Sequence, residues 1–215
     1  MAQDGAAANG GMGDTIVVAT GNAHKVTEIE AILSRALPGT RFVALHELGD
    51  FPDPVEDGDS FEANALIKAR AAHEQTGLVA IADDSGLVVD ALGGEPGIYS
   101  ARYAGVHGDD AANNAKLLHN MRDVPDDART ARFASCVALV GDDVCLTGMG
   151  YCEGAIGHEP RGEHGFGYDP LFLPQDMPGR TMAELEPGEK NAISHRFHAL
   201  EDLSAKIALR GLARD

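Results

Sequence analysis

Residues 15–37, TIVVATGNAHKVTEIEAILSRAL, contain an apolar run, a glycine turn and a helical pattern in direct succession. The first six residues are mostly apolar and include β-branched side chains, which is typical of a buried strand, and Gly21-Asn22 interrupts them. The apolar residues that then recur at helical spacing are Val26, Ile29, Leu33 and Leu37. A strand followed by a tight turn and a helix predicts an α/β fold.

The rest of the chain adds strands, helices and one long antiparallel pair. Residues 40–45 and 78–82 are predicted strands, and a helix is expected to start near Ser60. Two long β-type runs, 128–141 and 143–156, flank the turn sequence Gly141-Asp142, which predicts a hairpin that forms a second lobe. Residues 87–105 are predicted to form a further hairpin and a loop, residues 109–121 a capped helix, and Pro187 the start of a C-terminal helix.

The composition limits the class of protein. The chain has 215 residues, enough for one good core, and 34 Asp and Glu residues against 17 Lys and Arg, a net charge of −17 that disfavours binding to DNA or RNA. We expect residues 15–215 to form a single domain and residues 1–14 to be a disordered tail. The tail does not resemble a secretory signal, and no apolar run approaches the roughly 20 residues of a membrane span, so a cytoplasmic protein is expected.

The cysteines do not suggest a disulfide framework or a zinc site. Cys136, Cys145 and Cys152 are odd in number and lack C-x-x-C spacing, so we expect them to be reduced and mostly buried.

The stretch TGNAHK, residues 20–25, is a candidate phosphate site. It lies between a predicted strand and a helix N-terminus, where free backbone N–H groups and the helix dipole attract anions, and Lys25 adds a full positive charge. The stretch is not a Walker loop, and the alternative is a plain turn followed by a solvated lysine.

Acidic residues suggest a magnesium site. Asp83 and Asp84 follow the apolar run 78–82, and carboxylates at the end of a core strand are costly unless cations face them. Glu56, Asp83 and Asp84 are candidate ligands of Mg²⁺, and Asp84 is also a candidate base for an attacking water. Asn64 and Lys68 share one face of the helix predicted after Ser60 and can point at one ligand. The alternative is an exposed acidic turn in an acidic protein.

Two later segments carry groups suited to a nucleotide base. Residues 166–170, FGYDP, offer an aromatic ring for stacking and a carboxylate that can accept from a base or sugar, although they can equally pack in the core with Phe172. Residues 189–196, EKNAISHR, supply Lys190, Ser194, His195 and Arg196 as donors for keto oxygens and phosphates. On one continuous helix Arg196 would not share a face with Lys190 and Ser194, so the helix starts late or Arg196 reaches around it.

Together these stretches resemble the inosine triphosphate pyrophosphatase family, the non-canonical purine nucleoside triphosphate pyrophosphatases. The resemblance runs from Thr15 to Leu209 and rests on TGNAHK, EDGDSFEANALIKAR, IADDSGLVVDALGGEPGIYSARYAG, GFGYDPLF and EKNAISHR. It implies an elongated, two-lobed α/β fold around a long mixed sheet flanked by helices, and a homodimer. It also implies magnesium-dependent hydrolysis of ITP, dITP and XTP to the monophosphate and pyrophosphate, with attack at the α-phosphorus, and hence removal of deaminated purines from the nucleotide pool.

The resemblance also implies roles for individual residues. Glu56 and Asp84 would hold the metal, Asp84 would act as the base, and Lys68 would assist at the phosphates. The residues implied to bind substrate are Thr20, Gly21, Asn22, Ala23, His24, Lys25, Ser85, Phe166, Gly167, Tyr168, Asp169, Lys190, His195 and Arg196. Whether Asp83 joins Asp84 at the metal stays open.

Two other functions are compatible with parts of the pattern. One is a phosphomonoesterase with a phosphorylated aspartate, which would need a D-x-D arrangement where this chain has Asp83-Asp84-Ser85. The other is a nucleotide sensor that binds ITP without cleaving it.

Overall fold

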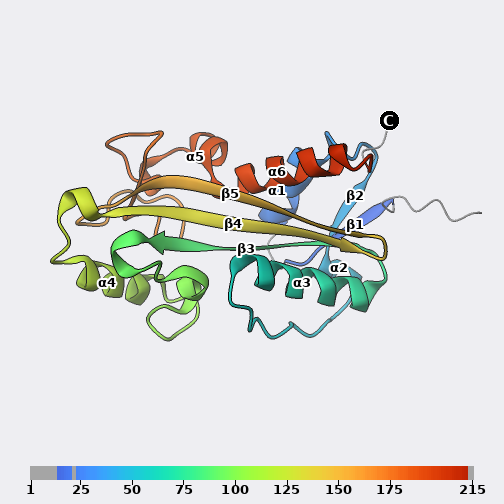
Figure 1. Ribbon diagram of the computed structural model, residues 1–215, viewed down its shortest axis with the longest axis horizontal. Coiled ribbons are helices and arrows are strands. Elements are labelled where there is room, and N and C mark those ends of the chain that lie inside the picture. Colours follow the sequence, from blue (N-terminus) through green and yellow to red (C-terminus); the bar gives the residue numbers. More distant parts are fainter. Residues whose placement is uncertain (1–13, 21–22, 213–215) are drawn as a thin grey trace, which may run out of the picture.

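The computed structural model describes residues 14–20 and 23–212, so the predicted tail, apart from Asp14, lies outside the described residues. Its centre is one six-stranded mixed sheet in the order β2-β1-β3-β4-β5-β6 (Figure 1). The strands are β1 (Thr15–Val18), β2 (Arg41–Ala44), β3 (Val79–Val89), β4 (Thr130–Gly141), β5 (Val144–Ile156) and β6 (Phe172–Pro174). β1 pairs in parallel with β2 and β3, whereas the pairs β3–β4, β4–β5 and β5–β6 are antiparallel. The predicted α/β fold and the β4–β5 hairpin are confirmed. The hairpin does not form the second lobe by itself, because its strands contribute to the buried clusters of both lobes.

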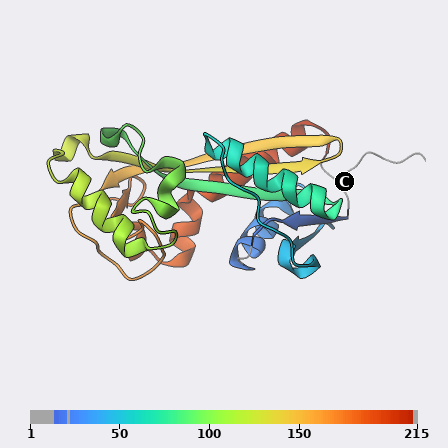
Figure 2. The same ribbon diagram turned by 90° about the horizontal axis from the view of Figure 1, so that it is seen from below.

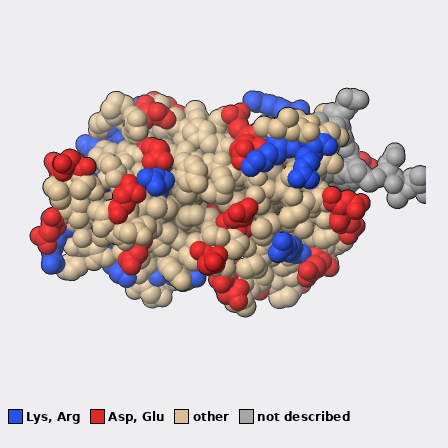
Figure 3. Space-filling view, viewed as in Figure 1, with Lys and Arg blue, Asp and Glu red and all other residues tan. Residues whose placement is uncertain are grey.

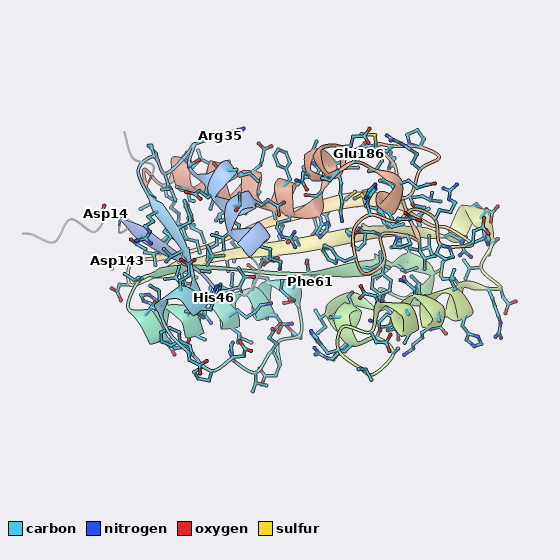
Figure 4. The ribbon with its side chains drawn as sticks, turned by 180° about the vertical axis from the view of Figure 1, so that it is seen from behind. Asp14, Arg35, His46, Phe61, Asp143 and Glu186 are labelled. Atoms are coloured by element: carbon cyan, nitrogen blue, oxygen red, sulfur yellow. The ribbon has the colours of Figure 1, made fainter. Side chains whose placement is uncertain are left out.

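Helices cover both faces of the sheet in the lobe that contains β1 and β2. α1 (Ala23–Leu33) and α6 (His195–Leu209) pack on one face, where Ile29 and Leu203 join Ile81 in one buried cluster. α3 (Phe61–Thr76) covers the other face through buried alanines that meet Ala82 and Cys136. The short α2 (Leu45–Leu48) follows β2. Seen from behind, Phe61 lies near the middle of the molecule's length, far from Asp14 and Asp143 at one end (Figure 4).

The second lobe is built around the other ends of β3, β4 and β5. It contains α4 (Asp110–Met121), α5 (Pro187–Ile193) and the 3-10 helices η1 (Asp90–Leu92), η2 (Gly97–Arg102), η3 (Asp126–Ala128) and η4 (Met182–Glu184). Its buried cluster joins Leu117 of α4 to Phe133 of β4 and Phe172 of β6. The long strands connect the two lobes, which gives the elongated shape visible in Figure 2.

The structure corrects the expectation that a strand ends at the acidic pair. β3 continues from Val79 through Asp83 and Asp84 to Val89, and the 3-10 helices η1 and η2 follow where a hairpin was predicted. The strand continues because β4 pairs with it along its whole length from Ala80. On its other edge, β1 pairs only as far as Ile81, and the Ser100 hydroxyl accepts from the Leu87 N–H at 2.9 Å. Among the described residues, no strand covers this edge between residues 82 and 86.

The C-terminal helical pattern divides into two helices at Ser194. Pro187 is the first residue of α5, as predicted, and Ser194 ends α5 and caps α6 by accepting from the Phe197 N–H at 3.1 Å. Arg196 therefore lies in the first turn of a new helix, which settles how it can leave the face shared by Lys190 and Ser194.

None of the helices in the described part of the chain combines the length and hydrophobicity of a membrane span.

Two glycines of β5 allow α6 to approach the sheet closely. A Cβ atom at Gly148 would lie 2.7 Å from the Leu203 nitrogen, and one at Gly150 would lie 2.7 Å from the His198 carbonyl carbon. Neither the strand nor the helix backbone can yield locally, so a larger residue here must move α6.

We expect Gly150→Ala to destabilise the protein by about 2 kcal/mol, because added volume at a tight backbone contact forces the elements apart. Gly188→Ala in α5 is the matched control, since a Cβ there meets no atom within 4 Å. Urea unfolding of both variants tests this, and equal midpoints would show that α6 is not held by this contact.

Candidate active site

Asp84 lies on the α3 face of β3 and is paired with a lysine. Its Oδ1 is 3.0 Å from Lys68 Nζ, and Glu56 Oε2 is 3.1 Å from the same nitrogen. Asn64 donates to Asp84 at 3.4 Å and accepts from the Gly58 N–H at 2.9 Å, so it links Asp84 to the loop that carries Glu56. α3 begins at Phe61, as expected near Ser60, and the Ser60 hydroxyl caps it by accepting from the Ala63 N–H at 3.2 Å.

The pKa of Asp84 is raised because burial and the nearby Glu56 together outweigh the effect of Lys68. Burial alone would lower the pKa of Lys68, but Asp84 and Glu56 together raise it above its ordinary value. An additional cation would therefore stabilise this group of residues.

Asp83 points to the opposite face of the sheet, toward α1 and α6. Its carboxylate is almost fully buried and lies 2.9 Å from Lys25 Nζ and 3.1 Å from Arg196 Nε. Burial would raise its pKa, but Arg196 and then Lys25 outweigh this and hold the pKa of Asp83 well below its usual range. Arg196 also lies 3.4 Å from Glu28 on α1. The lysine of TGNAHK and the arginine of SHR thus meet at one acid.

The two groups of charges lie on opposite faces of β3, because successive side chains of a strand point to opposite sides. They are adjacent along the chain, next to the edge of β3 that no strand of the described residues covers between residues 82 and 86. Lys68 also contributes, less than Arg196 and Lys25, to lowering the pKa of Asp83. A ligand that passes over residues 82–86 can contact both groups.

The expected set of three metal ligands is not assembled. Within residues 14–20 and 23–212, no group of three His, Cys, Asp or Glu side chains is placed to hold a metal ion, and Asp83 is separated from Glu56 and Asp84 by the sheet and paired with two cations. Glu56 and Asp84, both within about 3 Å of Lys68, remain as two hard oxygen donors. Mg²⁺ commonly uses one or two carboxylates and fills its other positions with water and phosphate, so this pair fits that ion.

A cavity of about 900 Å³ adjoins the Asp83 group. Ser85 lines it from β3, Phe133 from β4 and His195 and Arg196 from α6, and residues 164–169 form another part of its wall. Its size and mixed apolar and polar lining suit a small organic ligand such as a purine nucleoside. Phe133 and Glu28 were not foreseen as pocket residues, because only the sheet register and the packing of α1 bring them there.

The segment His164–Asp169 combines an exposed ring with a buried anchor. Phe166 is 68% exposed, whereas Tyr168 is buried in the same cluster as Phe172 and its hydroxyl donates to the Ser100 carbonyl at 2.8 Å. The two alternatives for FGYDP thus apply to different residues. Asp169 accepts from the Phe166 N–H at 2.8 Å and pairs with Lys190, whose ammonium lies 4.7 Å from the Phe166 ring centroid.

His195 forms part of the pocket as a neutral ring. It stacks on Phe133 with ring centroids 5.1 Å apart, and its Nδ1 has no partner among the described atoms. Burial, and then the charge of Arg196, lower the pKa of His195 to about 3. The nearby His198 has a different partner, since its Nδ1 lies 2.7 Å from the Tyr151 carbonyl oxygen.

We expect His195 to make the protein less stable as the pH falls. The unfolded state binds a proton near pH 6.5, whereas the folded state resists protonation until about pH 3, so stability is lost below about pH 6.5. Urea unfolding at pH 7 and pH 5 should show a loss about 1–2 kcal/mol larger in the wild type than in His195→Phe, which keeps a stacked ring. An equal loss in both proteins would mean that His195 titrates normally.

Some of the predicted substrate-binding residues lie next to or outside the residues that the structure describes. Thr20 follows β1, and its N–H donates to the Val18 carbonyl at 2.8 Å. Gly21 and Asn22 lie outside the described residues, as do the side chains of Ala23 and His24, so the anion site expected there stays a prediction.

Of the cysteines, Cys136 and Cys152 are buried and Cys145 is exposed, all three without a disulfide.

Acidic residues outnumber basic ones in this protein by 34 to 17. On the face drawn in Figure 3, acidic side chains lie over both lobes, with lysines and arginines among them. The cations that face Asp83, Asp84 and Asp169 are therefore a local concentration of positive charge in an acidic molecule.

The chain is similar to known proteins over most of its length. The model of the Ham1 family matches residues 16–206. The chain is 50% identical over 200 residues to a dITP/XTP pyrophosphatase of Mycolicibacterium paratuberculosis, with 93% of this chain and 97% of that protein covered. It is 50% identical over 202 residues to a dITP/XTP pyrophosphatase of Leifsonia xyli, with 93% and 97% covered. A solved structure of the Staphylococcus aureus Ham1 protein is similar with a TM-score of 0.83, 38% identity and coverage of 91% and 99%.

Proposed function

Because the chain belongs to the Ham1 family, we propose that it hydrolyses ITP, dITP and XTP to the nucleoside monophosphate and pyrophosphate, and so removes deaminated purines from the nucleotide pool. The relatives from Mycolicibacterium paratuberculosis and Leifsonia xyli are dITP/XTP pyrophosphatases, and the family match to residues 16–206 spans nearly the stretch over which the sequence resemblance runs. The observation that carries the proposal is the pair of adjacent acids on β3: Asp84 contacts Lys68 on one face, Asp83 contacts Lys25 and Arg196 on the other, and a pocket of nucleoside size lies beside them.

The triphosphate would lie across the edge of β3 at residues 82–86. Lys25 and Lys68 approach the edge from opposite faces of the sheet, so they can neutralise oxygens along one phosphate chain. Asp84, held by Lys68 and Asn64, would accept a proton from the attacking water. Asp83 would position Lys25 and Arg196 and would not touch the metal.

We further propose that Glu56 and Asp84 hold Mg²⁺. When bound, the ion would supply charge neutralisation at the phosphates that are cleaved. The support is the pair of carboxylates around Lys68 and the pKa of Asp84, which burial and then Glu56 raise despite the opposing effect of Lys68.

The base would occupy the pocket between His195 and Phe166. A 6-keto purine presents an acceptor where adenine presents an amino donor, so fixed donors such as Lys190 and Arg196 would pair with the former and face the latter unpaired. Both donors are held by acids, Lys190 by Asp169 and Arg196 by Asp83, and are therefore preorganised.

A panel of nucleoside triphosphates, assayed separately for pyrophosphate and orthophosphate, tests the proposal. We expect pyrophosphate from ITP, dITP and XTP, with rates for ATP and GTP lower by at least about a hundredfold. EDTA should abolish the reaction and Mg²⁺ should restore it. Orthophosphate as the first product, or a phosphorylated aspartate, would support the phosphomonoesterase, and ITP binding without cleavage would support the sensor.

We also propose that the protein acts as a cytoplasmic homodimer. The cytoplasmic location agrees with a substrate drawn from the nucleotide pool. Exposed Tyr99 and Val106, close in sequence in and after η2, are apolar side chains that a second copy could cover. Light scattering with size-exclusion chromatography would measure the mass in solution.

A further inference from the structure

The backbone of Gly167 is held from both sides by the first turn of α4. The Asp110 carboxylate accepts from the Gly167 N–H at 2.7 Å, and the Asn114 amide donates to the Gly167 carbonyl at 2.8 Å. Both contacts join segments more than 50 residues apart in the sequence. We infer that Asp110 and Asn114 are positioning residues that fix the Phe166–Asp169 segment as the wall against which the base is bound. This inference rests on the proposed function.

The geometry of α4 suits this role. Residues four apart on a helix lie on the same face, so Asp110 and Asn114 form a fixed pair of one acceptor and one donor. Gly167 has a φ of 61°, in the left-handed region, and presents its N–H and carbonyl to that pair. The Asn114 Oδ1 is buried without a partner among the described atoms, so the contact of its Nδ2 with the Gly167 carbonyl is the hydrogen bond that this side chain amide makes there.

The remaining backbone anchors of Phe166 lie within the segment itself: its N–H donates to the Asp169 carboxylate at 2.8 Å, and its carbonyl accepts from the Asp169 N–H at 3.2 Å. Tyr168 is tied to Ser100, and Asp169 is tied to Lys190 and to the Phe166 N–H. These contacts hold the segment from its C-terminal side. The Phe166 ring is largely exposed, so loss of the α4 contacts would free the peptide next to it and allow the ring to move relative to Lys190.

The effect should be confined to the base end of the site. Asp110 lines the pocket, whereas Glu56, Lys68 and Asp84 lie around the start of α3 on the other lobe. Weaker positioning of the base wall should therefore raise KM for ITP and leave kcat nearly unchanged, because the phosphate-binding residues keep their geometry.

The test compares Asp110→Ala and Asn114→Ala with two informative variants. Asp110→Asn keeps an oxygen acceptor for the Gly167 N–H and should behave like the wild type. Asn120→Ala is the matched control, because Asn120 lies on the same helix but donates to the Tyr103 hydroxyl at 2.8 Å. Each alanine variant in the pair should raise KM for ITP by about three- to tenfold, as expected for one hydrogen bond, and raise the Kd for IMP by the same factor.

Inhibition by tripolyphosphate separates positioning from general damage. This probe has the phosphates and lacks the base, so its inhibition constant should be unchanged in all four variants. The inference is overturned if the wild type cleaves ITP and the two alanine variants match Asn120→Ala in KM and in IMP binding, or if they weaken tripolyphosphate and IMP equally. Absence of ITP cleavage by the wild type would instead overturn the proposed function, and IMP binding would still report on the α4 contacts.

Discussion

Asp84→Asn is expected to lower kcat for ITP by about a thousandfold, since the variant loses the proposed base and one of two proposed metal ligands. The fold should remain intact, because asparagine is of similar size and Lys68 keeps its contact with Glu56. Steady-state rates of pyrophosphate release, with circular dichroism to confirm folding, provide the measurement.

A matched control for this variant lies at the end of the same strand. Asp90 follows β3 directly and accepts from Arg132 at 3.1 Å in an exposed position, so Asp90→Asn makes the same chemical change outside the site. Its kcat should stay within about twofold of the wild type. A folded Asp84→Asn variant that retained a tenth or more of the wild-type kcat would exclude Asp84 as the base.

The neighbouring substitution, Asp83→Asn, is expected to act mainly on stability, with a loss of about 3 kcal/mol at pH 7. Removal of one partner from a buried ion pair leaves the other charges without compensation, and Asp83 is the acid that Lys25 and Arg196 share. Arg196, nearly buried itself, would keep only the longer contact with Glu28.

Chemical unfolding of Asp83→Asn and Asp84→Asn under identical conditions tests this contrast. The two variants differ by one position in the chain and carry the same substitution, so each controls for the other. We expect the loss of stability in the first and the loss of kcat in the second. Equal stabilities would mean that Lys25 and Arg196 find other partners when Asp83 is absent.

The sequence predicts the local elements well where several signals agree. β1, α1, the start of α3 near Ser60 and the β4–β5 hairpin all agree with the sequence, which shows periodic apolar patterns next to turn-forming or polar residues there. β3 was predicted to end too early, because two adjacent acids interrupt its apolar pattern. The acids are tolerated inside the strand only because distant cations, Lys25, Lys68 and Arg196, face them from helices on both sides.

The sequence identified the segments that form the site, but not how their side chains are arranged in space. Motif content indicated that TGNAHK, the acidic pair and SHR would meet, and the described residues of these segments do meet. Asp83 and Asp84 point to opposite faces because β3 continues through both residues, which the local sequence did not indicate. The contacts of Asp110 and Asn114 with Gly167 depend on how α4 packs against the rest of the lobe. Such pairings arise from tertiary structure, and no local pattern encodes them.

The three long strands that run through both lobes also determine how the protein unfolds. β3, β4 and β5 contribute residues to the buried clusters of each lobe, so neither cluster can be lost without breaking backbone ladders that the other uses. The amide protons of these strands should therefore exchange with solvent at a common slow rate along their whole length, as expected for a single cooperative unit and unlike two domains joined by a hinge.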